Sequence, residues 1–175
     1  VEKMAMVGSN AEFNASAIKL AHQYDDVYAV VGWHPEDSKY FHETQAEVLR
    51  NQLQDSKVVA LGEIGLDYYE TNSPRKIQRR VFEEQLELAS KFHIPVAIHN
   101  RDAFEDTYAI LKNAHVENFG GVMHSFNGDP EWLNKFLELG MHISYSGVAS
   151  FNSAHDVHKS VQATPADRIM AETDA

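Results

Sequence analysis

Four side chains that can bind metal ions or move protons each follow a short apolar run in this sequence. They are Glu63, His99, His124 and Asp174. Carboxylates and imidazoles are the donors that Zn²⁺, Mn²⁺, Co²⁺ and Ni²⁺ take in proteins when no thiolate competes. Glu63 alone has an equally simple structural interpretation, as a salt-bridged or capping residue at a strand end. The recurrence at four runs favours a metal centre, because clustered buried polar groups are costly without a partner.

Strands and helices alternate along the chain. Apolar runs predict short strands, and apolar residues at helical spacing predict the helices between them. We expect strands at 3–7, 27–31, 58–62, 96–98, 120–123, 141–145 and 168–171. We expect helices around 13–21, at 44–53, from Pro74 with Ser73 as the N-cap, and at 103–113, 130–139 and 155–162. Such alternation is typical of a parallel α/β sheet built from right-handed units, in one domain spanning residues 1–175.

Two architectures are possible for such a sheet: an open doubly wound sheet or a closed barrel. In a doubly wound sheet a ligand site gathers between two neighbouring strands at a switch point. A barrel brings many strand ends to one rim, and the four candidates follow four different strands. We therefore expect a TIM-type (β/α) barrel. Because such barrels have eight strands in about 250 residues, the sequence indicates one without its first strand–helix unit and its C-terminal segment, which exposes two apolar sheet edges.

Further polar residues lie near the same strand ends. His34 precedes Pro35 just past a strand, so it either contacts a substrate, handles a proton or structures its loop. Arg101 could bind an anionic group, and Asp102 could orient His99 or cap the following helix. Asp67 leads Tyr68 and Tyr69 into a loop, where we expect Asp67 to contact the substrate. The two aromatic faces could stack on a base or simply line the rim.

Composition narrows the classes of function. The 175 residues carry a formal net charge of −11 and no cysteine, so disulfides and thiolate metal sites are excluded. An acidic chain is a poor general binder of polyanions, and a nucleic acid would have to be held at a metal centre. The sequence contains no run of about 18 apolar residues and no basic-then-apolar leader, so we expect no membrane span and a cytoplasmic location.

The motifs around these residues resemble those of a known family. GEIGLDYY at 62–69, HNRDA at 99–103, MHSF at 123–126 and ETDA at 172–175 are similar, in order and spacing, to the signature segments of the TatD family of metal-dependent hydrolases. GWHP at 32–35 is similar to that family's Gly-x-His-Pro turn. The resemblance covers essentially the whole chain. It implies a TIM-type barrel and one or two divalent ions of Zn, Mn, Mg, Ni or Co.

The resemblance also implies an activity and a role for each residue. The activity is hydrolysis of phosphodiester bonds in DNA, often as an exonuclease acting on single strands or strand ends. Glu63 would be shared between two metals, and His99 and His124 would complete the second. Asp174 would belong to the first metal and help position the attacking water, for which it would act as the general base. From the residues themselves we expect His34, Arg101 and Asp67 to contact the substrate. Family members usually open with a strand carrying a His-x-His pair, which this sequence lacks, so the first metal would keep Glu63 and Asp174 alone.

Two alternatives remain at this point. A related barrel hydrolase would cut a cyclic amide or a lactone, and such enzymes often bridge their metals with a carboxylated lysine, whereas Glu63 occupies that place here. A catalytically silent binding protein would hold no metal and lose no function on Glu63→Ala. No protein partner can be inferred from the sequence.

Overall fold

A computed structural model describes residues 1–70 and 72–174. Its strands are β1 (Met4–Val7), β2 (Val27–Val31), β3 (Val58–Asp67), β4 (Val96–Arg101), β5 (Gly121–Met123), β6 (His142–Tyr145) and β7 (Ile169–Ala171). Its α-helices are α1 (Ala11–Gln23), α2 (Glu43–Gln52), α3 (Arg75–Phe92), α4 (Phe104–Asn113), α5 (Pro130–Glu138) and α6 (His155–Ala163). Short 3₁₀ helices cover Pro35–Tyr40, Val116–Asn118 and Gly147–Ser150. The predicted alternation is confirmed.

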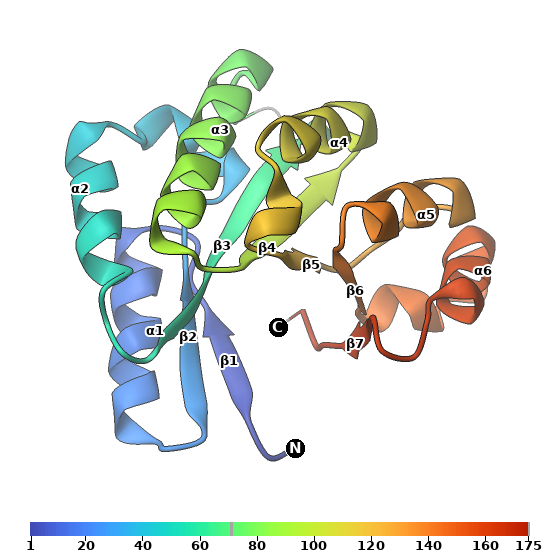
Figure 1. Ribbon diagram of the computed structural model, residues 1–175, viewed down its shortest axis with the longest axis horizontal. Coiled ribbons are helices and arrows are strands. Elements are labelled where there is room, and N and C mark those ends of the chain that lie inside the picture. The colour runs from blue at the N-terminus through green and yellow to red at the C-terminus, as the bar shows by residue number, and fades with distance from the viewer. Residues whose placement is uncertain (71, 175) are drawn as a thin grey trace.

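Within the described residues, the seven strands form one parallel sheet in the order β1 to β7, which is also their order in the sequence. Every strand therefore ends at the same rim. The sheet curves, and the helices lie along its outer side (Figure 1). No pairing joins β1 to β7 in the described part of the chain, so the barrel is open. The predicted α/β class and partial TIM-type barrel are confirmed.

Helix α3 shows how the helices are attached to the sheet. Its apolar stripe includes Val81, Phe82, Leu86 and Ala89, all of which are at most 1% exposed. Burying one such side chain stabilises the fold by about 1.5–3 kcal/mol. Aromatic rings do the same between α4, α5 and the loop after β5, where Phe104, Phe126 and Phe136 are in mutual contact. These contacts fix the loops that carry the candidate residues.

Two local predictions were wrong. β3 does not end before Glu63 but continues to Asp67, because residues 64–67 pair with β4 after a shift of register between Leu61 and Ile64. Ser73 does not cap α3. Its hydroxyl instead donates to the carbonyl of Glu36 and accepts from the amide of Lys39, so it ties the loop after β2 to the start of α3.

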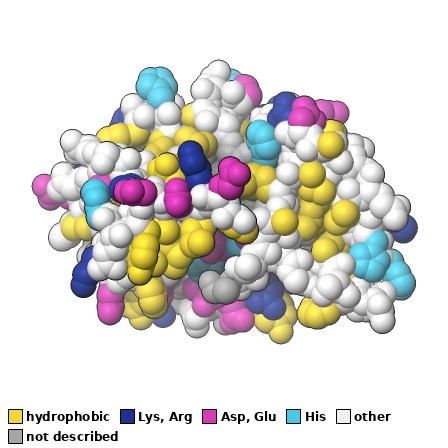
Figure 2. Space-filling model, turned by 90° about the horizontal axis from the view of Figure 1, so that it is seen from below, with side chains coloured by type: hydrophobic (Ala, Val, Ile, Leu, Met, Phe, Trp, Pro, Cys, Tyr) yellow, Lys and Arg dark blue, Asp and Glu magenta, His cyan; other side chains and the backbone are white. Residues whose placement is uncertain are grey.

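The two edge strands are the exposed part of the sheet. All four residues of β1 and all three of β7 are exposed, including Met4 and Met170 at about half of their surface. Hydrophobic side chains also gather in patches on the face seen from below (Figure 2). The prediction of two apolar edges is thus confirmed for the described residues. No helix among them is long and apolar enough to cross a membrane.

Candidate metal centre

The strand ends bring three of the candidate side chains into one group. His34 follows β2, Glu63 lies on β3 and His99 lies on β4. One potential ligand atom from each of these residues lies within 4.8 Å of the others. The group was expected to contain His124 and Asp174, with His34 as a substrate contact. The structure instead places His34 beside Glu63. His124 also faces Glu63, and Asp174 reaches this arrangement through its contact with His124.

A single carboxylate oxygen is the centre of the arrangement. Glu63 Oε1 lies 2.8 Å from His99 Nδ1, 3.4 Å from His124 Nε2 and 3.9 Å from His34 Nε2. The side chains of all four residues are 16–19% exposed, so solvent reaches them without surrounding them. Three imidazoles from different strands thus converge on one oxygen.

His99 is held from behind by a second carboxylate. Its Nε2 lies 2.8 Å from Asp67 Oδ2, while its Nδ1 faces Glu63. Asp67 is only 1% exposed, and its other oxygen accepts the backbone N–H groups of Tyr69 and Glu70. This burial leaves Asp67 almost no surface for a substrate, in contrast to the contact expected. Asp102, the residue expected either to orient His99 or to cap the following helix, is exposed.

His124 has a matching partner that the sequence analysis missed. Its Nδ1 contacts Glu172 Oε2, and its Nε2 faces Glu63. Glu172 is positioned in turn by the backbone N–H of Ser125 and the hydroxyl of Ser144, both of which donate to Oε1. The signal available in the sequence was the position of Glu172 directly after the last strand, two residues before Asp174.

Asp174 completes this side of the arrangement. Its Oδ1 lies 3.2 Å from His124 Nε2, and its Oδ2 accepts the hydroxyl of Ser125 at 3.1 Å. The side chain is 49% exposed, more than the other candidates. Ala175, the last residue of the ETDA motif, lies outside the described residues.

His34 and Arg101 occupy different surroundings. His34 Nδ1 accepts the backbone N–H of Glu36 and so structures its own loop, while its ring contacts the ring of His99 edge-on at 4.5 Å. Arg101 lies outside the group of three. Its guanidinium covers the ring of Tyr69 at 3.8 Å and lies 3.8 Å from Glu70.

Two buried amides of α3 hold the strand ends in place. Gln85 accepts the backbone N–H of Trp33 and donates to its carbonyl, and Gln78 does the same for Asp67. Both glutamines are at most 1% exposed. They supply backbone partners where the strand ladder ends, since unpaired buried backbone groups are costly. The loop carrying His34 and the strand end carrying Asp67 are thereby attached to one helix.

Gly65 allows β3 to approach β4 beside the site. Its φ of +140° is unusual for residues with a side chain, and a Cβ there would lie 2.0 Å from the carbonyl oxygen of His99. Only glycine permits this approach without displacing the strand that carries His99.

Electrostatics makes these groups strongly coupled. Burial works to raise the pKa of Glu63, but the hydrogen bond from His99 and the nearby histidine charges outweigh it and hold that pKa at about 2. Burial works to lower the pKa of His99, but the hydrogen bonds to Asp67 and Glu63 raise it to about 9. The pKa of His124 is raised against burial by Glu172 and Glu63, whereas burial and the charge of His99 lower the pKa of His34.

The residues fit a divalent metal ion by their donor chemistry. A histidine ligand ordinarily donates its outer N–H to a carboxylate or carbonyl, which fixes the tautomer and leaves the other nitrogen for the metal. Asp67 with His99 and Glu172 with His124 each form such a pair, and both inner nitrogens face Glu63. Glu63, His34, His99, His124 and Asp174 therefore offer imidazole and carboxylate donors from one rim.

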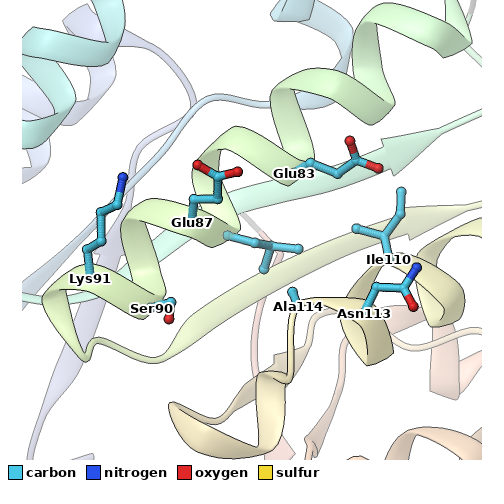
Figure 3. A pocket seen from close by; sticks show the side chains of 8 residues that line it. Glu83, Glu87, Ser90, Lys91, Ile110, Asn113 and Ala114 are labelled. Carbon is cyan, nitrogen blue, oxygen red and sulfur yellow. The ribbon is translucent and has the colours of Figure 1, made fainter.

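Two hollows of the surface contain none of these ligand residues. One of about 440 Å³ lies between α3 and α4 and is lined by residues such as Glu83, Glu87, Lys91 and Asn113 (Figure 3). It contains none of the candidate residues, and its acidic, basic and amide side chains do not form a recognisable catalytic or metal-binding set. The candidate centre is identified by its converging side chains and not by a cavity.

Comparison with known proteins supplies independent findings. Residues 1–175 match the family model described as TatD related DNase. The uncharacterized metal-dependent hydrolase YabD of Bacillus subtilis is 37% identical over 174 residues, covering 99% of this chain and 68% of the relative. The 3'-5' ssDNA/RNA exonuclease TatD of Klebsiella pneumoniae is 32% identical over 176 residues, covering 100% and 67%.

A solved structure gives the same result in three dimensions. The crystal structure of YjjV, a TatD homologue from Escherichia coli, matches with a TM-score of 0.94 and 30% identity, covering 100% of this chain and 68% of that one. This chain spans between 58% and 68% of the length of the curated relatives compared with it.

Proposed function

The chain belongs to the TatD related DNase family, and from this premise we propose that it carries the metal-binding strands of a divalent-metal-dependent phosphodiesterase acting on DNA. The substrate we propose is a single strand or a strand end, and the reaction is hydrolysis by an activated water. The similar K. pneumoniae protein is named as a 3'-5' ssDNA/RNA exonuclease, which supports this class of substrate.

The observation that carries the proposal is the convergence on Glu63 Oε1. Three histidines from three loops or strands lie within 3.9 Å of that oxygen, and two of them have a carboxylate behind the ring. If Glu63 served only in a structural salt bridge, one cationic partner would be enough. Three partners, of which two have fixed tautomers, match a site that holds cations between carboxylate and imidazole donors.

We assign the ligands accordingly. Glu63 would be shared between two ions, His99 and His124 would complete one of them, and Asp174 would contribute to the other. Zn, Mn, Mg, Ni and Co are the candidate ions, at one or two sites. Such an ion supplies Lewis acidity, which lowers the pKa of water toward about 7 and stabilises charge on a phosphodiester.

The protein residues would perform the remaining tasks. Asp67 and Glu172 keep His99 and His124 in the tautomers that direct a lone pair inward. Asp174 is half exposed and anchored by Ser125, so it can accept the proton of an attacking water as the general base. His34 has a pKa lowered by burial and by the charge of His99, and its Nδ1 accepts the backbone N–H of Glu36, so its Nε2 can donate a hydrogen bond beside Glu63.

Charge also favours a strand end over a duplex. With a net charge of −11, the chain has little electrostatic attraction for a long stretch of phosphates. A single phosphodiester bond that binds a cation held by carboxylates needs no such attraction, because the cation reverses the negative field at that point. Within the described residues, the ion-pair partners of Glu63 are all histidines and no lysine is among them. The lack of a lysine that could be carboxylated disfavours the cyclic amide or lactone alternative.

The test is metal-dependent cleavage of end-labelled single-stranded DNA. The protein is stripped with a chelator, Mg²⁺, Mn²⁺ or Zn²⁺ is restored in turn, and Glu63→Gln is compared with Glu138→Gln on α5 as a charge-matched control. We expect shortening from one end that needs the metal, is lost in Glu63→Gln and persists in Glu138→Gln. Metal binding that depends on Glu63 without any cleavage would refute the phosphodiesterase. Absence of metal binding would support a catalytically silent protein.

A further inference from the structure

The start of α3 carries an unusual concentration of positive charge. Arg75, Lys76, Arg79 and Arg80 lie within six positions and are all exposed. They are four of the 15 basic residues in a chain whose net charge is −11. This cluster, which we call the α3 basic cluster, is therefore a local exception to an acidic surface.

Helix stability does not account for the cluster. A helix N-terminus carries partial positive charge, so cations in the first turn destabilise the helix and carboxylates stabilise it. α1, α2, α4, α5 and α6 each have an acidic residue in the first turn. The first turn of α3, which lies within the described residues, has none and has Arg75 and Lys76 instead. An anionic ligand would give these two cations a role.

The basic cluster borders a hollow and two aromatic rings. The hollow has a volume of about 660 Å³ and is lined by the four basic residues with Tyr68, Glu83 and Asp106. Arg75 lies over the ring of Tyr68 at 4.3 Å, and Arg101 lies over the ring of Tyr69 at 3.8 Å. Tyr69 is 60% exposed, so part of its ring surface remains available for stacking.

Not all of these charges are neutralised by neighbours. Arg79 pairs with Asp106, and Arg80 pairs with Glu84. In the described part of the chain, Arg75 and Lys76 have no carboxylate within the 4 Å that defines an ion pair. The hollow thus presents two cations that no described carboxylate neutralises, one of them stacked on an aromatic ring.

Tyr68, which lines the hollow, is the direct sequence neighbour of a residue at the candidate metal centre. Tyr68 and Tyr69 directly follow Asp67, which holds His99. Arg101 lies two residues beyond His99, so on strand β4 it projects to the same face and nearer the rim. A strand whose end reached Glu63 would next meet the Arg101–Tyr69 pair and then the Arg75–Tyr68 pair.

We propose that the surface formed by Tyr68, Tyr69, Arg75, Lys76 and Arg101 binds the backbone phosphates and the bases of a single-stranded nucleic acid next to the scissile bond. This inference rests on the proposed function and extends it to a second binding region. Sequence-tolerant single-strand binding uses this combination of cations along the backbone and aromatic faces under the bases. A duplex does not offer its base faces, so the surface selects single strands.

The test is binding without turnover. Fluorescence anisotropy in excess chelator measures the affinity for a single-stranded oligonucleotide of about 10 nucleotides, the site size of one such surface. Arg75→Gln/Lys76→Gln is compared with Lys112→Gln/Lys135→Gln, which removes the same charge from α4 and α5. Lys112 and Lys135 also lie over aromatic rings, so the control matches the chemistry as well as the charge.

The expected result is a change in the salt dependence. Each phosphate contact contributes about 0.7 to the slope of log affinity against log salt for single strands, so losing two contacts lowers the slope by about 1.4. Affinity at about 0.1 M salt then falls about 25-fold relative to its value at about 1 M. The melting temperature of Arg75→Gln/Lys76→Gln stays the same or rises, because two cations leave the helix N-terminus.

Three outcomes would overturn the proposal. They are an unchanged slope in Arg75→Gln/Lys76→Gln, an equal loss in the control variant, and equal affinity for an abasic oligomer of the same length, which would show that only charge is bound. The proposed function is judged separately by the metal-dependent cleavage. If the protein fails to cleave but binds as expected, the phosphodiesterase fails and the binding surface stands.

Discussion

Asp67 is expected to control metal affinity although it would not touch the metal. Its Oδ2 lies 2.8 Å from His99 Nε2, and its Oδ1 accepts two backbone N–H groups. Asp67→Asn can keep the backbone contacts through the amide oxygen, but it then directs an N–H₂ donor at His99. His99 must accept that hydrogen bond at Nε2, which moves its proton to Nδ1, the nitrogen that faces Glu63.

The expected loss of metal affinity follows from the lost orientation of one ligand nitrogen, Nδ1 of His99. Removing such an outer partner lowers metal affinity about 10–100-fold, which corresponds to about 1.4–2.7 kcal/mol. The assay is isothermal titration calorimetry of Mn²⁺ or Zn²⁺ binding, with Asp67→Asn beside Asp156→Asn. Asp156 lies on α6 with 65% of its side chain exposed, and we expect its variant to bind metal like the parent chain.

A spectroscopic measurement separates positioning from general damage. Nitrogen-15 NMR reports which ring nitrogen of His99 carries the proton. Above the pKa of His99, we expect the proton on Nε2 in the parent chain and on Nδ1 in Asp67→Asn. Unchanged metal affinity together with a shifted tautomer would refute the assignment of Nδ1 as the metal-facing atom.

Three further expectations concern stability. In the metal-free chain, the low pKa of Glu63 contributes stability that is present above pH 4.5 and is lost as the pH falls toward about 2. The raised pKa of His99 contributes stability that is present below pH 6.5 and is lost as the pH rises through about 9. Urea unfolding should therefore show a loss of about 3 kcal/mol between pH 6.5 and about 9, at about 1.4 kcal/mol per pKa unit, and the loss should vanish in His99→Asn. Gln78→Leu should destabilise the chain by at least about 2 kcal/mol, since it leaves the buried N–H and C=O of Asp67 unpaired; exposed Gln54→Leu should cost less than about 0.5 kcal/mol. Phe136→Ala should cost about 3–5 kcal/mol in the same assay because it leaves a cavity at a fully buried ring, and a cost below about 1 kcal/mol would contradict the aromatic contacts described.

The sequence predicted the order of elements and the rim because both depend on local patterns. Apolar runs and helical spacing identify strands and helices, and polar residues after strands identify the rim. Glu63, His99 and His124 were accordingly expected near one another, and the structure places both histidine rings within hydrogen-bonding or ion-pair distance of Glu63. The ligand assignments themselves remain predictions.

What the sequence did not predict depends on side-chain contacts across the fold. Gln78 and Gln85 lie seven residues apart on the buried face of α3, where their amides were overlooked beside an apolar stripe. Asp67 was expected to contact substrate because β3 was taken to end before Glu63. The longer strand places Asp67 behind His99 instead. Glu172 follows the last strand in the sequence, but its pairing with His124 is a contact between distant parts of the chain that only the structure shows.

The order of the sheet has a consequence for hydrogen exchange. Within the described residues, β7 has three exposed residues and pairs only with β6, so its amides should exchange through local opening and not through global unfolding. Glu172 and Asp174 nevertheless reach His124, which follows β5. An ion joining Asp174 to Glu63 would extend the cooperatively folded unit to the last strand. If adding the ion slows amide exchange in β7 and leaves exchange in β1 unchanged, ion binding determines how far the cooperatively folded unit extends along the sheet.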